Sequence, residues 1–113
     1  MRERDQGTQS LTLRASAREG VARLTIEGEL DMASAPVLER AVDGARKSAR
    51  VLELELAGVS FMDSTGLRTL LAIRGRLEES GCELRLVAVP PPVLRVLEVT
   101  RTSSLFAMDP VAG

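Results

Sequence analysis

The sequence predicts an α/β fold in which a mixed sheet of four to five strands has its helices packed on one face. Short segments of alternating apolar and polar residues are interleaved with segments whose apolar residues follow helical spacing. Each alternating segment is apolar on one side only, whereas strands of a parallel sheet covered on both faces are apolar throughout. The order strand-strand-helix-strand-helix-strand-helix makes the second, third and fourth strands parallel, joined by right-handed crossovers.

The size and composition of the chain suit one domain with one apolar core. It has 113 residues, 44% of them hydrophobic, and a formal net charge of −1. Residues 1–9 are polar and predict a flexible N-terminal tail, which leaves residues 10–113 as the single domain. A net charge near zero argues against direct binding of nucleic acid, because contacts to phosphates need clustered cations.

The first two strands are predicted to form an antiparallel hairpin. Residues 11–16 and 22–28 both alternate, and the short connection 17–20 between them contains a glycine. The second strand is expected to end at 28–31.

A helix, a strand and a second helix follow the hairpin. Ser34 and Pro36 mark the first helix start, and the next strand is predicted over 51–56. The second helix should enter from the polar turn 62–67 and end at Ser80-Gly81, with Gly81 as a C-terminal cap. Its expected buried stripe is Leu67, Leu70, Leu71 and Leu77, and that of the first helix is Leu38, Ala41, Val42 and Ala45.

The last third of the chain predicts a strand, a short helix and a closing segment. The strand covers 83–88, three prolines at 90–92 stop it, and a helix follows over 93–100. Leu105 and Phe106 suit a last short strand or a covering segment.

The turn between the third strand and the second helix is the candidate site. Ser64 and Thr65 can each cap a helix, and Gly66 removes a side chain so that another group can approach closely. In open α/β sheets, ligands and partners meet the loops at the carboxyl ends of parallel strands. Three such loops are expected here, at 30–32, 58–64 and 89–92, so Asp31, Asp63 and Ser64 should share one surface.

The sequence gives little support to an enzymatic function. It contains no histidine, which excludes a Ser-His-Asp triad, and its one cysteine, Cys82, is best explained as a small apolar residue at a strand start. No carboxylate cluster has metal-ligand spacing and no glycine-rich phosphate loop is present, so no metal and no cofactor is expected. Asp31 and Asp63 are more typical of turns or caps than of paired catalytic carboxylates. A serine in the position of Ser64 is, on its own, most often a helix cap.

Two short motifs resemble those of STAS domains, and within that family those of the bacterial anti-sigma factor antagonists. The first is Gly58-Val-Ser-Phe-Met-Asp-Ser-Thr-Gly-Leu67, which follows a strand that ends Leu-Glu-Leu56, and the second is Gly28-Glu-Leu-Asp31. Gly81 also suits the glycine before the family's fourth strand. The resemblance extends over about residues 11–106.

The resemblance implies a phosphorylation switch in the control of transcription. A cytoplasmic location is expected from the sequence itself, because residues 1–10 lack the apolar segment of a secretory signal and no apolar run approaches the roughly 20 residues of a spanning helix. Ser64, or alternatively Thr65, would be phosphorylated by an anti-sigma factor that is also a serine kinase, and a serine phosphatase would reverse this. The unphosphorylated chain would bind the anti-sigma factor and free a sigma factor, as substrate and not catalyst, with no direct contact to nucleic acid and no membrane insertion. The implied partner-binding residues are Asp31, Met62, Asp63, Ser64, Thr65, Gly66, Leu67 and Arg68.

Two other functions fit the same fold. The chain could be a STAS subunit of a membrane lipid-transport ATPase that acts as a structural partner, or a sensor of a small molecule or nucleotide at the same loops. Family members usually carry a further helix after the last strand, so a shorter C-terminal cover is expected here.

Overall fold

A computed structural model describes residues 11–109 and contains one five-stranded sheet in the order β1-β2-β3-β4-β5. β1 and β2 are antiparallel, and β2, β3, β4 and β5 are parallel to one another. The predicted mixed sheet is therefore confirmed. The predicted tail, 1–9, and residues 110–113 lie outside the described residues.

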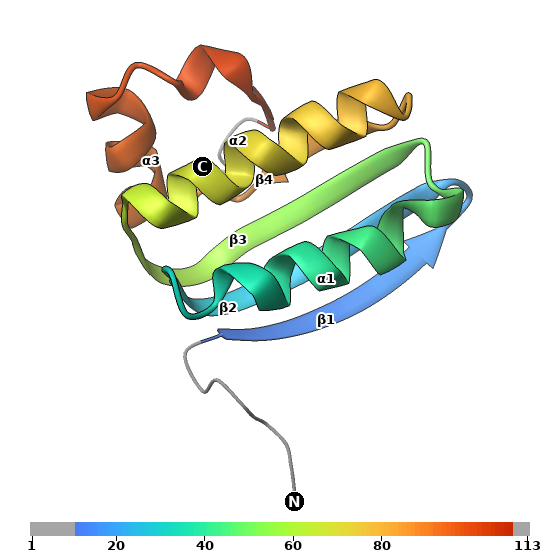
Figure 1. The fold of residues 1–113 in the computed structure, drawn as a ribbon, viewed down its shortest axis with the longest axis horizontal. Coiled ribbons are helices and arrows are strands. Elements are labelled where there is room, and N and C mark those ends of the chain that lie inside the picture. The colour runs from blue at the N-terminus through green and yellow to red at the C-terminus, as the bar shows by residue number, and fades with distance from the viewer. Residues whose placement is uncertain (1–10, 110–113) are drawn as a thin grey trace, which may run out of the picture.

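The elements follow one another along the chain as the alternation and helical spacing predict (Figure 1). They are β1 (Leu11–Arg18), β2 (Val21–Leu30), α1 (Ala35–Ala45), η1 (Arg46–Ser48), β3 (Val51–Met62), α2 (Ser64–Glu79), β4 (Glu83–Val87), α3 (Pro91–Val99), η2 (Ser103–Leu105) and β5 (Ala107–Met108).

The two longer helices, α1 and α2, lie side by side over the same face of the sheet (Figure 1). The strand side chains beneath them are buried, with Leu24, Leu54 and Leu86 at matching register. Their neighbours on the other face include Arg23 and Glu53, which stay partly exposed and form a salt bridge of 2.9 Å. The alternation in the sequence thus corresponds to one covered and one open face.

The hairpin turn between β1 and β2 is tighter than predicted. Only Glu19 and Gly20 lie outside the strands, and both have positive φ angles, 55° and 82°. Two consecutive residues with positive φ give the turn geometry that matches the natural twist of a two-residue hairpin. The strands therefore extend into the predicted connection.

Strand β3 is longer than predicted and removes most of the expected loop at 58–64. It continues to Met62 and stays paired with β2, but the register shifts between Thr25 and Glu27 and again between Gly28 and Glu29. Bulges of this kind break the period of two in the side chains, so the alternation that marks a strand disappears from the sequence. A Cβ on Gly58 would lie 2.6 Å from Cγ of Glu27, so glycine permits the close pairing there.

The ends of the later helices follow from backbone hydrogen bonding. Helix α2 ends as predicted: Gly81 has φ +79°, its N–H donates to the carbonyl of Glu78, and the N–H of Cys82 donates to that of Leu77. Helix α3 begins at Pro91, before the predicted start. Proline is tolerated in the first turn of a helix, because the N–H that it lacks would have no partner within the helix.

The closing segment also differs from the prediction in detail. Phe106 is buried as a covering residue, but the last strand is Ala107–Met108, beside β4, and Leu105 ends η2 instead. Within residues 11–109, no helix combines the length and the apolar composition that a membrane span requires.

Candidate functional site

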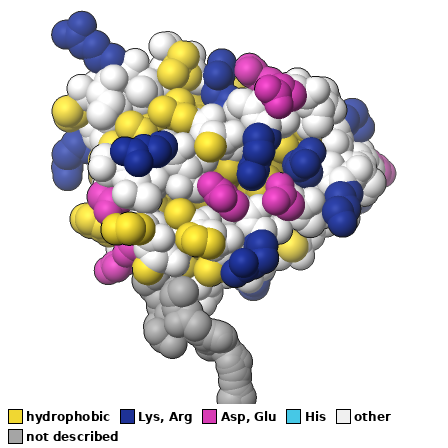
Figure 2. Space-filling model, viewed as in Figure 1, with side chains coloured by type: hydrophobic (Ala, Val, Ile, Leu, Met, Phe, Trp, Pro, Cys, Tyr) yellow, Lys and Arg dark blue, Asp and Glu magenta, His cyan; other side chains and the backbone are white. Residues whose placement is uncertain are grey.

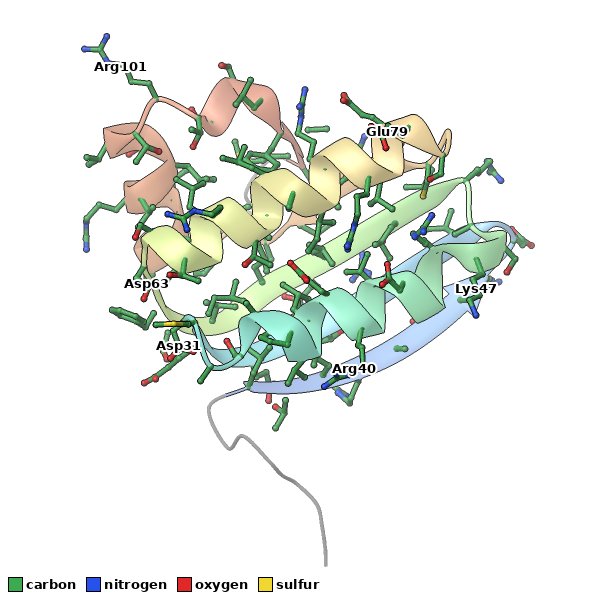
Figure 3. All side chains as sticks on the ribbon, viewed as in Figure 1. Asp31, Arg40, Lys47, Asp63, Glu79 and Arg101 are labelled. Carbon is green, nitrogen blue, oxygen red and sulfur yellow. The ribbon has the colours of Figure 1, made fainter. Side chains whose placement is uncertain are left out.

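The candidate site lies where β2 and β3 end together. Leu30 pairs with Met62 in the sheet, so Asp31 and Asp63 are the next residues of two adjacent strands. The N–H of Asp63 also donates to the carbonyl of Leu30, at 3.3 Å. Figure 3 shows Asp31 and Asp63 at the same end of the molecule, beside the starts of α1 and α2. The expected convergence of these two loops is confirmed.

Asp63 alone connects β3 to α2, and it caps the helix. Its backbone is extended, with φ −110° and ψ −169°, and its carboxylate accepts the N–H of Gly66 at 3.0 Å. Ser64 is thus the first helical residue, and the prediction that Ser64 or Thr65 supplies the cap is wrong. Since the strand runs directly into the helix, the cap falls to the one residue between them, and its negative charge also suits the helix dipole.

Removing the cap is expected to weaken the fold modestly. Asp63→Ala should lower the free energy of unfolding by about 1 kcal/mol, the usual effect of losing a cap. Asp63→Asn should recover most of that loss, because asparagine caps helices about as well. Urea denaturation of the three proteins measures both values. An alanine variant as stable as the parent would show that this hydrogen bond contributes nothing.

The hydroxyl of Ser64 faces solvent. The residue is exposed, and its Oγ has no hydrogen-bond partner within residues 11–109. Thr65 is less open: it is partly buried, and its carbonyl accepts the hydroxyl of Thr69 at 2.9 Å. Of these two neighbouring hydroxyls, that of Ser64 is the more accessible to a modifying enzyme or a partner.

Gly66 permits a close contact between α2 and the end of β2. A Cβ at this position would lie 2.6 Å from the carbonyl oxygen of Leu30 and 2.7 Å from Cγ of Met62. The expected close approach is therefore made by the protein's own backbone. It holds the first turn of α2, and Ser64 with it, against the sheet.

Asp31 fixes the turn that leads into α1. Its carboxylate accepts the N–H of Ser34 at 3.0 Å, and its own N–H donates to Oγ of Ser34, also at 3.0 Å. The buried hydroxyl of Ser34 donates in turn to the carbonyl of Glu29, at 2.7 Å. Asp31 is thus a turn residue and Asp63 a cap residue, as their positions in the sequence indicate.

The eight residues that the resemblance implies for partner binding differ in exposure. Ser64 and Arg68 are exposed, and Asp31, Asp63 and Thr65 are partly buried. The remaining three are buried and shape the site from beneath: Met62, Gly66 and Leu67.

Two exposed apolar side chains beside the aspartates were not among the site residues expected from the sequence. Met32, which follows Asp31, is 74% exposed, and Phe61, two residues before Asp63, is 46% exposed. Hydrophobic side chains gather at this end of the molecule in Figure 2. Phe61 is one of only two aromatic residues in the chain, which is the one signal that could have singled it out.

The third loop of the predicted edge contributes an apolar groove. Val89, Pro91, Leu94, Arg95 and Glu98 line it, and its volume is about 290 Å³. Cys82 lies outside the site and is buried, and this burial raises the pKa of its thiol above the ordinary value. A protonated, buried thiol agrees with the structural role expected for it.

Fold and site together define a class of protein: a small α/β domain with one open sheet face that presents a serine at the start of a helix. The STAS domain family matches residues 12–112. The chain therefore belongs to the STAS domain family.

Two relatives and one solved structure at about 30% identity are named as anti-sigma factor antagonists. The anti-sigma F factor antagonist of Paenibacillus polymyxa is 30% identical over 104 residues, 90% of this chain and 86% of that protein. The anti-sigma-B factor antagonist of Listeria monocytogenes is 32% identical over 89 residues, 78% of each chain. The crystal structure of an anti-sigma factor antagonist from Mycobacterium paratuberculosis superposes with a TM-score of 0.79 at 29% identity, and covers 93% of this chain and 90% of that one.

Proposed function

We propose that this protein is an anti-sigma factor antagonist that phosphorylation of Ser64 switches off. The observation that carries the proposal is the hydroxyl of Ser64, exposed and without a hydrogen-bond partner in residues 11–109, at the first position of α2. The names of its relatives and the extent of their similarity support the role.

In the unphosphorylated state, the end of the sheet is the docking surface for an anti-sigma factor. The exposed and partly exposed residues there would make the contacts: Asp31, Asp63, Ser64, Thr65 and Arg68. The buried Met62, Gly66 and Leu67 hold this surface in shape. Docking would occupy the anti-sigma factor in the cytoplasm and free its sigma factor.

Phosphorylation would act at the interface and leave the fold in place. A phosphate adds about −1.5 to −2 charges, and at this exposed position it displaces no packed side chain. In the complex, however, the charge must lose water against a surface that fits a neutral hydroxyl, and burying an unpaired charge is costly. The phosphorylated protein would then dissociate.

The partner that inactivates the protein would be the anti-sigma factor itself, acting as a serine kinase, and a serine phosphatase would restore binding. The chain is the substrate in this cycle. A role as a structural subunit of a lipid-transport ATPase receives less support, because the relatives at about 30% identity are named as antagonists.

Phosphate transfer from ATP tests the proposal. The protein is incubated with ATP and the ATP-binding anti-sigma kinase encoded in its own genome, and the modified residue is mapped by mass spectrometry. One phosphate is expected, on Ser64, lost in Ser64→Ala and kept in Thr65→Ala. Phosphate on Thr65 instead, or no transfer at all, would refute the assignment of Ser64.

A further inference from the structure

Arg68 lies one helical turn beyond Ser64 on the exposed side of α2. Both residues are exposed, and they are four positions apart in the same helix. Residues at this spacing are neighbours on a helix surface, with Cβ atoms about 5–6 Å apart. Long helical side chains also lean toward the helix N-terminus, so an arginine at position 68 can reach toward Ser64.

Arg68 differs from the other arginine side chains of α2 in its partners. Arg74 forms a salt bridge with Glu78 at 3.3 Å, and Arg76 forms one with Asp43 at 3.5 Å. For Arg68, no acidic side chain within residues 11–109 lies close enough to form an ion pair. As far as residues 11–109 are concerned, its guanidinium is therefore available to a group that arrives near the helix start.

We propose that Arg68 binds the phosphate of phosphorylated Ser64 within the same chain. This inference rests on the proposed modification of Ser64. An acidic group that stands four residues before a basic one is the favourable order on a helix, and arginine binds phosphate through charge-assisted hydrogen bonds. The helix end itself is partly used, because the carboxylate of Asp63 already accepts the N–H of Gly66.

The pair would change the docking surface in two ways at once. The phosphate adds negative charge at Ser64, and Arg68, a proposed partner contact, is drawn away from the partner. Arg68 also offsets the repulsion between the phosphate and the adjacent carboxylate of Asp63. The pair would therefore stabilise the phosphorylated state of the chain and lower its affinity for the anti-sigma factor.

The pKa of the phosphate, measured by ³¹P NMR, tests the pair without a kinase. Phosphoserine is incorporated at position 64 during synthesis of the full chain, alone and together with Arg68→Gln, Arg68→Lys or Arg76→Gln. A nearby cation favours the doubly charged phosphate, so Arg68→Gln should raise its second pKa by about 0.2–0.4 unit. Arg68→Lys should recover part of the shift. Arg76→Gln, a loss of the same charge farther along α2, should change the pKa much less.

Equal pKa values for the parent and Arg68→Gln would overturn the inference, as would an equal shift from Arg76→Gln. Thermal unfolding of the unphosphorylated variants shows whether each one folds, so that a pKa change can be assigned to the lost charge. The two proposals can fail separately. If a kinase phosphorylates Ser64 but Arg68→Gln leaves the phosphate pKa unchanged, only the pairing of Arg68 with the phosphate is refuted. An Arg68 effect without kinase labelling refutes only the phosphorylation cycle.

Discussion

Ser64→Asp is expected to weaken binding to the anti-sigma factor by about a hundredfold or more, while Ser64→Ala binds as tightly as the parent. The residue is exposed at the proposed docking surface, so a carboxylate there must be desolvated against the partner. A hundredfold loss corresponds to about 2.8 kcal/mol, which one unpaired interfacial charge can supply. Isothermal titration calorimetry of the three proteins with the anti-sigma factor measures the difference.

Ala72→Asp provides the matched control for this experiment. Ala72 is also exposed on α2 and lies two turns after Ser64, so the variant carries the same new charge away from the helix start. Its affinity should stay close to that of the parent. Equal losses in Ser64→Asp and Ala72→Asp would point to a general charge effect and contradict a specific site at Ser64.

Gly66→Ala is expected to lower the free energy of unfolding by about 1–3 kcal/mol, the usual cost of overpacking. The added Cβ would lie 2.6 Å from the carbonyl oxygen of Leu30 and 3.1 Å from its Cβ. That carbonyl oxygen also accepts the N–H of Asp63, so it cannot move without disturbing the start of α2. The variant should also weaken partner binding, because the first turn carries Ser64.

Gly75→Ala, the same substitution in the same helix, should have the opposite effect. A Cβ at Gly75 meets nothing within 4 Å, and alanine stabilises a helix interior by about 0.5–1 kcal/mol relative to glycine. Urea denaturation of both variants decides the matter. If both substitutions stabilise the protein, or both destabilise it, the packing of Gly66 against Leu30 is not what distinguishes them.

Most of the fold could be predicted because its signals are local. The one-sided alternation of the strands indicated a sheet with one open face, and Gly81 marked the end of α2. The extension of β3 to Met62 could not be predicted, since it depends on bulges in the pairing with β2, which lies far away in the sequence. The cap was misplaced for the same reason: once the strand reaches Met62, only Asp63 remains to connect it to the helix.

The candidate site was predictable to the extent that topology alone determines it. The carboxyl ends of adjacent parallel strands meet at one edge, which was enough to bring Asp31 and Asp63 together. The burial of Met62 was not predictable, because it depends on how the first turn of α2 packs at the end of β2. Leu67 is buried as its helical spacing predicts, whereas the exposure of Met32 and Phe61 beside the aspartates had no signal in the spacing.

The most direct measurement is the affinity of the anti-sigma factor for protein that carries phosphoserine at position 64, compared with the unmodified protein. An affinity at least about a hundredfold lower is expected, with changes in the ¹H–¹⁵N spectrum confined to residues around the start of α2. Equal affinities would contradict the switch, and spectral changes throughout the sheet would contradict a mechanism that acts only at the docking surface.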